Sequence, residues 1–480
     1  MKPTLFTLSL ILLVTSVFSQ ETKLDPQSRT IQTVHLKFPV NSIDVRAVGM
    51  GHTQIANGKH FNAMMYNPAL LSYQRNSVEI FGIQAGLPPA TYDAADYLSH
   101  HIAEFEEALS LNQIMDGLEQ LTEKNATNAQ KLDALNQIQD GLVFVDDLFR
   151  EVTGPGDDPK VHGINIIPGI NAQIGNWGFS LYGFGQAGFM VQLSPTFEAL
   201  LDVEVPTTLS DPRATLRAAI ELTEALVPAM TGPRKFSDQA FPTAFYVSYF
   251  DVIGAVGYGR QVYKNLSLGA NLKIINRRFL IDKINAEDYD QIISDVWDKF
   301  QSNVTGVTAD VGAHYQFRFG SSVGVSMQNI FPVKEITKSV DTEFRFNQIT
   351  RSHVNRDSLE YDSWETTITR PFTLEVPFIL SIGVCHPITA NWDVAFDWVD
   401  LAENDTRYEE SADRIRLGTE YRYPLIKDKL TIAPRLGMSD QRITVGMGLK
   451  VSNYLHIDSA YAYDRFVNEN AFFAQIRIGW

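Results

Sequence analysis

Two short motifs in this chain carry residue types that could support cofactor binding or catalysis. The stretch GFGQAG at 183–188 matches the glycine spacing of a dinucleotide-binding turn, but that turn must open a helix, and FMVQL continues a strand instead. The stretch GSSVG at 320–324 matches the serine-esterase elbow, which needs a strand-to-helix turn with a histidine and an acid nearby. Here it joins two predicted strands. We therefore predict no catalytic residues, no cofactor and no enzymatic activity.

Histidine and cysteine residues do not form a metal-binding pattern either. His100 and Glu104 lie four residues apart, but no HExxH motif or second group of ligands follows, so we interpret them as a solvated helix face. The single cysteine, Cys385, excludes an internal disulfide and lies in an apolar run, which indicates an inert wall residue. We predict no metal site.

The amino terminus indicates export. Lys2 precedes a short apolar run from Leu5 to Val14, and Ser19 offers a small residue for cleavage, so 1–19 is predicted to be a secretory signal peptide. The run is too short to cross about 30 Å of hydrocarbon as a helix. The net charge of −16 argues against nucleic acid as a partner, because phosphates require a basic face. An acidic, exported chain with one cysteine suits a bacterial envelope.

Alternation of apolar and polar residues dominates the carboxy-terminal third. In AFFAQIRIGW at 471–480, apolar side chains occupy every second position up to Trp480, while Arg477 lies on the opposite face. Period-2 alternation over such lengths predicts half-buried strands. The same pattern recurs at 391–401, 412–423, 429–439 and 441–451.

Two architectures fit these strands: a soluble sandwich with apolar faces inward, or a membrane barrel with apolar faces outward. Membrane strands need about 9–11 residues, whereas soluble strands cluster near 5–6, and the runs here reach ten or more. Charges of both signs gather on the other face, which suits a polar lumen. The barrel is therefore favoured. The charges expected to face its lumen are Asp397, Arg416, Glu420, Arg435, Arg442 and Arg477.

Fourteen strands can be counted, which predicts an all-β, antiparallel transmembrane barrel. Short connections alternate with long ones, as periplasmic turns alternate with external loops in bacterial outer-membrane barrels. The strands are expected at 78–86, 163–175, 177–194, 243–259, 266–281, 304–319, 322–331, 372–385, 391–401, 412–423, 429–439, 441–451, 454–463 and 471–480. The long external connections include 93–152, 195–242, 282–303 and 332–371. Only the short connection near Ser439 breaks the alternation.

The last residue resembles a known signature. A final strand with a terminal aromatic residue, here Trp480, is similar to the carboxy-terminal signal of bacterial outer-membrane proteins. The resemblance implies that the barrel assembly machinery is a partner. A terminal aromatic side chain would also suit the periplasmic membrane interface.

The segment before the wall, 20–77, carries a more specific resemblance. It contains GMG, with Gly49 and Gly51, and then YNPALL, with Asn67, Pro68 and Ala69. This order resembles the amino-terminal hatch of FadL-type transporters of hydrophobic compounds, which are fourteen-stranded barrels. The resemblance implies that 20–77 plugs the lumen, and that ligand binds externally and leaves sideways through the wall. Fourteen strands would enclose a substantial lumen that such a plug could fill.

The loops carry a second resemblance. Residues 93–152 show two apolar stripes at helical spacing, which predicts two helices between the first two strands. A helical insertion after NPALL resembles the exported barrel family described as TraF-type conjugal transfer proteins, itself similar to the FadL group.

These observations predict three regions: signal peptide 1–19, plug 20–77 and barrel 78–480, in the bacterial outer membrane. Two functions stay open. The first is a passage for hydrophobic small molecules, which makes membrane lipid and a hydrophobic ligand the partners. The alternative is a platform for a conjugation or secretion assembly, favoured by the roughly sixty inserted residues, which exceed ordinary loop lengths.

Overall fold

The computed structural model describes most of the wall and part of the amino-terminal segment. The described residues are 44–58, 63–73, 76–101, 126–153, 161–192, 243–285, 302–331, 338–347, 363–372, 376–404, 410–427, 429–452, 454–464 and 469–479, with isolated positions at 103–104, 116–117, 120–121, 201, 203, 218 and 408. The predicted signal peptide, residues 20–43, most of the connection 195–242 and Trp480 lie outside the described residues.

The wall is a closed antiparallel β-barrel, in which neighbours in sequence are neighbours in space and β1 pairs with β17. Its strands are β1 (Ser77–Leu87), β2 (Val161–Ile174), β3 (Trp177–Gln192), β4 (Thr243–Tyr263), β5 (Leu266–Asn285), β6 (Ser302–Gln316), β7 (Ser322–Gln328), β10 (Ile379–Thr389), β11 (Trp392–Trp398), β12 (Ile415–Tyr421), β13 (Tyr423–Ile426), β14 (Leu430–Ser439), β15 (Arg442–Val451), β16 (Leu455–Asp464) and β17 (Glu469–Gly479). Because β12 and β13 are separated only by Arg422 and both pair with β14, they count as one strand. The predicted fourteen-stranded barrel is confirmed.

The two faces of the wall follow the alternation of the sequence. In β17, Phe472, Ile476 and Ile478 are exposed on the outside, whereas Gln475 and Arg477 are buried on the inside. The strand keeps this alternation from Ala471 to Gly479, because the wall closes only if β17 pairs along its length with both β16 and β1. The outer face is therefore apolar and the inner face polar.

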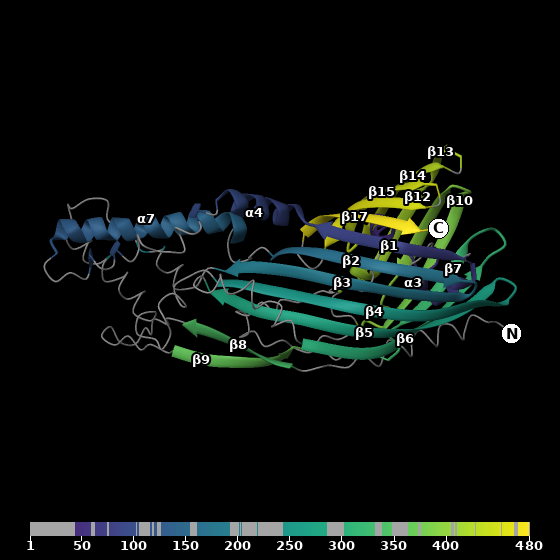
Figure 1. The fold of residues 1–480 in the computed structure, drawn as a ribbon, viewed down its shortest axis with the longest axis horizontal. Helices are drawn as coiled ribbons and strands as arrows, with labels where there is room; N and C mark the ends of the chain where they lie inside the picture. Colours follow the sequence, from purple (N-terminus) through teal and green to yellow (C-terminus); the bar gives the residue numbers. More distant parts are fainter. Residues whose placement is uncertain are drawn as a thin grey trace. The chain divides into compact units, whose positions relative to one another are not determined.

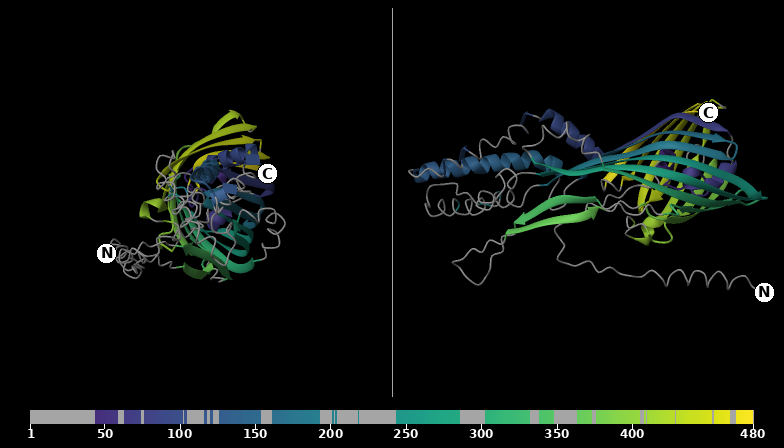
Figure 2. Two further views of the ribbon diagram at one scale, coloured as in Figure 1. Left: turned by 90° about the vertical axis from the view of Figure 1, so that its left-hand side faces the viewer. Right: turned by 60° about the horizontal axis from the view of Figure 1, so that its bottom comes forward.

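Strand lengths differ around the barrel. The strands β4 and β5 have 21 and 20 residues, whereas β11 and β12 have 7 each. Figure 2 shows the long strands in blue and teal extending further than the yellow ones. Connections at the end of the barrel where β17 ends are short, such as 175–176 between β2 and β3 and 390–391 between β10 and β11.

The long connection between β1 and β2 contains two described helices, while much of the first predicted stripe, from Ile102 to Leu109, lies outside the described residues. Helix α4 (Pro89–His100) starts with proline at its first position, and α7 (Asn128–Thr153) buries Leu135, Ile138 and Leu142 on one face. Both helices are fastened to the start of β2, since the Val152 carbonyl lies 2.6 Å from Nε2 of His162 and Thr91 bonds to the amide of Gly163. Figure 1 shows α4 and α7 extending from the strands. Among the described helices, none is long and apolar enough to cross a membrane.

One element differs from the expectation. Residues 332–371 were expected to form a loop, but β8 (Lys338–Asn347) pairs with β9 (Ser363–Phe372) as a separate two-stranded sheet. The hairpin does not extend the wall, because its two strands pair with each other and not with β7 or β10. The count of wall strands is therefore unaffected.

Short helical turns lie inside the wall before β1. They are α2 (Val45–Gly49), α3 (Ala63–Tyr66) and the 3-10 helix η2 (Pro68–Tyr73), and nearly all of their residues are buried. Figure 1 places α3 among the strands of the barrel. We call residues 44–58 and 63–73 the inner segment.

Candidate functional site

The inner segment begins with a short helix whose start and end are both determined by local chemistry. The Asp44 carboxylate accepts a hydrogen bond from the amide of Arg46 at 2.9 Å and so caps α2. The chain then turns at Gly51, where φ is +60° and where a Cβ would collide with carbonyl oxygens of β12 and β14. The amide of Gly51 donates to the hydroxyl of Thr444 at 3.0 Å. The GMG motif therefore lets backbone touch backbone.

Asn67 joins three parts of the molecule. Its Nδ2 donates to the carbonyl oxygens of Ile55 at 2.9 Å and Ala313 at 3.1 Å, and its Oδ1 accepts from the amide of Ala69 at 3.1 Å. Pro68 begins η2 directly after it. The asparagine thus holds the two halves of the inner segment together and fastens them to β6.

Carbonyl groups of α3 and η2 are received by neutral side chains of the wall. Gln173 of β2 donates to the carbonyl of Leu71 at 2.7 Å. Similar bonds run from Asn271 to Met64, from Ser326 to Tyr66 and from Gln328 to Met65, at 3.1, 2.6 and 2.7 Å. Because buried carbonyls need partners, these bonds specify where the carboxy-terminal half of the inner segment lies.

A belt of inward-facing glycines gives the inner segment its room. At Gly269 of β5, a Cβ would collide with the backbone of Pro68, and at Gly437 of β14 with the backbone of Gly51. Several of these glycines stand directly opposite each other on neighbouring strands. The members of the belt are Gly178, Gly257, Gly259, Gly269, Gly312, Gly324, Gly383, Gly418, Gly437 and Gly446. Glycine at these positions permits contact along most of the circumference.

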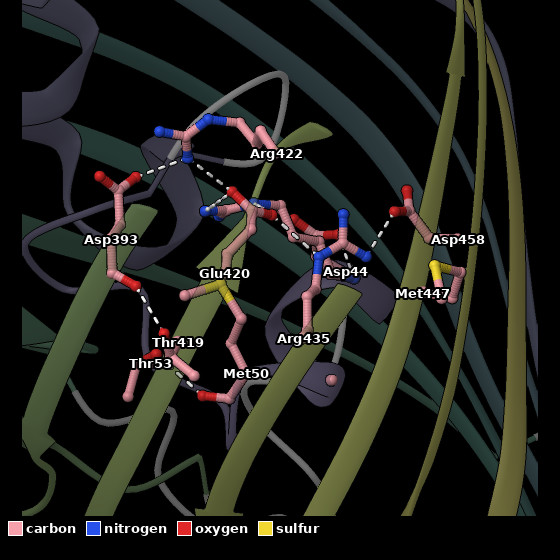
Figure 3. Close-up of polar contacts among 12 residues, drawn as sticks. Asp44, Met50, Thr53, Asp393, Thr419, Glu420, Arg422, Arg435, Met447 and Asp458 are labelled. Carbon is pink, nitrogen blue, oxygen red and sulfur yellow. Dashed lines mark hydrogen bonds and ion pairs between the residues drawn. The ribbon is translucent and has the colours of Figure 1, made fainter. Parts of the chain in front are cut away.

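The amino-terminal half of the inner segment is held by charge. Arg46 forms a two-pronged ion pair with Glu420 of β12, with N–O distances of 2.9 and 3.2 Å. Glu420 also accepts from Arg435 and Arg422, both at 2.9 Å, and Arg422 reaches Asp393 at 2.6 Å. Figure 3 shows Glu420 between Arg422 and Arg435. Glu420 therefore receives three guanidinium groups in a site that is almost fully buried.

The same network continues around the wall. Asp458 of β16 binds Arg435 and Arg477, both at 2.7 Å, and Arg477 lies 3.6 Å from the Asp44 carboxylate. Burial alone lowers the pKa of Arg46, but the neighbouring Glu420 carboxylate outweighs it and raises that pKa above its ordinary value. Arg46 is thus permanently charged, and its pairing with Glu420 does not depend on pH in the physiological range.

Two further charges expected in the lumen contact the inner segment. One carboxylate oxygen of Asp397 accepts from the amides of Gln54 and Ile55 at 2.6 and 3.0 Å. Arg416 donates to the carbonyl of His52 at 3.4 Å. The structure thus brings Asp397, Arg416, Glu420, Arg435 and Arg477 to one side of the inner segment.

Arg442 differs from the expectation. It occupies the inward parity but is exposed at the start of β15, with its guanidinium 3.8 Å from the ring centre of Tyr463 on the outward parity. The two preceding turn residues, Asp440 and Gln441, have positive φ and end the wall there. At the terminal residue of a strand, a long side chain can therefore bend to the opposite face of the sheet.

Some of the network was missed by sequence reasoning. Asp44, Arg46, Asp393, Arg422 and Asp458 were not among the expected charges, although Asp458 occupies the inward parity of its strand. Arg46 could have been found as a charged residue inside the apolar stretch VRAVG. A buried arginine needs a partner, so its presence signals a carboxylate in the wall.

The motifs rejected as catalytic lie in the wall. GFGQAG is internal to β3, and Ser322 of GSSVG begins β7 and donates to the Ala56 carbonyl at 3.2 Å. Its neighbour Ser321 lies 2.7 Å from Nδ1 of His386. Among the described residues, no group of three or more histidine, cysteine, aspartate or glutamate side chains is arranged to hold a metal.

An apolar cluster occupies the opposite side of the lumen, along β2, β3 and β4. Its buried members are Ala47, Met64, Met65, Tyr66, Leu71, Ile167, Phe184 and Ala255, with Tyr182 and Ile253 packed against them. Next to it, the pairing of β2 with β3 stops at Ile166 and resumes at Gly169, so the ladder skips Ile167 and Pro168. Pro168 has no N–H to donate, which accounts for part of this break.

Comparison with solved structures finds outer-membrane barrels at low identity. The chain is 12% identical to the toluene transporter TodX of Pseudomonas putida, covering 90% of this chain and 95% of that one with a TM-score of 0.39. It is 9% identical to a FadL homologue of Pseudomonas aeruginosa, over 91% of this chain and 97% of that one, with a TM-score of 0.38. It is 7% identical to CdiB from Escherichia coli, over 66% of this chain and 53% of that one, with a TM-score of 0.30. Likenesses this distant carry no function to this chain.

Comparison at the level of sequence is more decisive. No curated protein matches the chain. A family model described as "F plasmid transfer operon, TraF, protein" matches residues 64–466, which include most of the wall and the helical insertion. Because that match spans far more than half of the sequence, the chain belongs to this TraF family.

Proposed function

We propose that the protein is an outer-membrane barrel that lets hydrophobic small molecules pass, and that the inner segment is its plug. The observation that carries the proposal is the apolar cluster beside the break in the β2–β3 ladder. An apolar ligand gains free energy from such a surface, at about 25 cal/mol for each Å² removed from water. A gap in backbone pairing is also where a membrane wall can part with the fewest hydrogen bonds lost.

The plug supports the proposed hydrophobic passage, because it obstructs the barrel axis and leaves a lateral exit through the wall as the shorter path for a ligand. The glycine belt brings the inner segment against strands from β3 to β15, and Val45 donates to Gln475 of β17. A molecule moving along the barrel axis would have to displace these contacts. A molecule leaving between β2 and β3 would pass the outer rings of Pro168 and Phe250, which lie over Gly183.

Uptake by living cells tests the proposal. A deletion strain should take up a radiolabelled alkane or aromatic hydrocarbon several-fold more slowly than the complemented strain. Pro168→Thr restores an N–H at the break and should slow uptake. Pro434→Thr, on an exposed position at a similar gap between β14 and β12–β13 but outside the apolar cluster, should not. Equal uptake by the deletion and complemented strains for every hydrophobic probe would refute the proposal.

A second function rests on a different observation. Helix α7 has 26 residues, or about 39 Å of helix, and exposes Asp133, Asp140 and Asp147 along one face. Together with the family's link to a plasmid transfer operon, this supports a platform for an envelope assembly. A photo-crosslinker at these positions should then capture a defined envelope protein in cells. Crosslinks no more frequent than at exposed Gln441 would contradict it.

A further inference from the structure

The two halves of the inner segment are attached to the wall by different chemistry. Residues 44–54 make their wall hydrogen bonds and ion pairs with charged or polar groups of β11, β12, β15 and β17, beside apolar contacts of Val45 and Val48 with β16 and β17. Residues 63–73 are held by the neutral side chains of β2, β5 and β7 and by the apolar cluster, which residues 44–54 join only through Ala47. The two halves therefore need not leave the wall together.

The charged side of the interface is balanced on the wall alone. Glu420, Asp458 and Asp393 are paired with Arg435, Arg477 and Arg422, three acids with three bases. The partners contributed by residues 44–54 are one acid and one base, Asp44 and Arg46. The paired wall charges therefore sum to zero, and so do the charges of Asp44 and Arg46.

Because the wall charges are balanced, residues 44–54 can separate from the wall without leaving its paired charges unpaired. If residues 44–54 move away, Glu420 keeps Arg435 and Arg422, and Arg477 keeps Asp458. The large penalty for breaking a buried ion pair comes from the charge left without a partner, and here the wall leaves none among these groups. Asp44 and Arg46 would move into water, which solvates both.

Connectivity favours the same half. The carboxy-terminal half runs through η2 into Asn76 and β1, so it is tethered to the wall by the chain itself. Between the halves, the Ala56 carbonyl is held by His314 and Ser322, and the Ile55 carbonyl by Asn67. These bonds place a pivot at residues 55–58.

We propose that residues 44–54 form a gate that swings away from β11–β17 about this pivot, while residues 63–73 stay seated. The opening would be lined by the balanced charges of Asp397, Arg416, Glu420, Arg435, Asp458 and Arg477. Such a lining admits small hydrophilic solutes and ions of both signs with little selectivity. This polar passage is separate from the hydrophobic route and does not depend on it.

Ion conductance in planar bilayers tests the gate with the full mature chain in potassium chloride. Arg46→Gln removes the two-pronged pair to Glu420 and should raise the mean conductance at least tenfold, with nearly equal permeability for K⁺ and Cl⁻. The matched control is Arg150→Gln on α7, whose guanidinium is exposed and pairs with Asp146. It should conduct like the wild type. Heat-modified migration in gels reports that each barrel is folded.

A reversible lock provides a second arm that keeps Arg46. Val48 and Ala460 lie in one buried cluster, so Val48→Cys with Ala460→Cys, in a Cys385→Ala background, should tie the gate to β16 when oxidised. Oxidation should abolish channel openings and reduction should restore them. Unchanged conductance in folded Arg46→Gln, or openings that persist in the oxidised lock, would overturn the gate and leave the hydrophobic passage to its own uptake test.

Discussion

Replacement of Asn67 by aspartate tests the clamp at the centre of the inner segment. The change keeps the size of the side chain and the acceptor for the Ala69 amide, but it removes both donated hydrogen bonds. An oxygen then faces the carbonyl oxygens of Ile55 and Ala313. Both the pivot and the attachment to β6 should weaken.

The magnitude follows from the bonds lost. Two neutral hydrogen bonds contribute about 1 kcal/mol each, and a buried carbonyl left unsatisfied at Ile55 adds about 1–3 kcal/mol. The free energy that holds the inner segment closed should therefore fall by about 3–5 kcal/mol. Since about 1.4 kcal/mol corresponds to a factor of ten, local opening should become about 100-fold more frequent or more.

Native-state hydrogen exchange measures this opening directly. Amides of 67–70, which include Asn67 and Leu70 bonded within the segment, should exchange about 100-fold faster in Asn67→Asp while amides of the wall strands keep their rates. The matched control is Asn76→Ala, an exposed asparagine whose Oδ1 accepts a hydrogen bond from the turn amide of Gly175. Unchanged exchange at 67–70 in the aspartate variant would refute the clamp.

Three further substitutions test other parts of the architecture. Gly269→Val should displace the inner segment, because its side chain would collide with backbone; proteolysis within 44–73 should accelerate severalfold. Val445→Arg, 45% exposed on the outer face, should lower the free energy of unfolding by about 2–4 kcal/mol in urea titrations in lipid. Leu142→Ala, buried in α7, should cost that helix about 2–5 kcal/mol, seen as faster proteolysis of the insertion with the barrel intact.

Each of these has a control at a neighbouring position. Gly254→Val has open space around the added Cβ and should leave the inner segment protected. Ile443→Arg, at the start of β15, should cost about 0–1 kcal/mol, because charge is tolerated near the membrane interface. Val143→Ala, 43% exposed on α7, should change little. Effects equal to those of the paired variants would contradict the faces assigned to β4, β15 and α7.

Local pattern was sufficient to predict the wall. Ile476 and Arg477 point to opposite sides because successive residues of a strand always do, whatever the strand pairs with. The same rule placed Asp397, Arg416 and Glu420 on the buried face. Strand number and the alternation of short and long connections are also properties of the chain read in order. The fourteen strands could therefore be counted before the barrel was seen.

The alternation of apolar and polar residues did not predict the structure correctly where the same alternation is compatible with more than one arrangement. Residues 338–347 alternate as the wall strands do, yet β8 pairs only with β9. Arg442 has inward parity, yet its position at the start of β15 lets it reach Tyr463 on the outside. In both cases the deciding factor is what lies next to the residue across the sheet.

Tertiary structure alone decided the candidate site. Arg46 and Glu420 are 374 positions apart, and the sequence around each residue does not indicate that the two form a pair. Gly269 reads in sequence as an ordinary strand glycine, and only the position of Pro68 shows why a Cβ is excluded there. Asn67 was recognisable as part of a turn, but its bond to Ala313 depends on where the turn rests against β6. A strand's faces follow from covalent geometry, whereas contacts between the inner segment and the wall exist only after the barrel has closed around it.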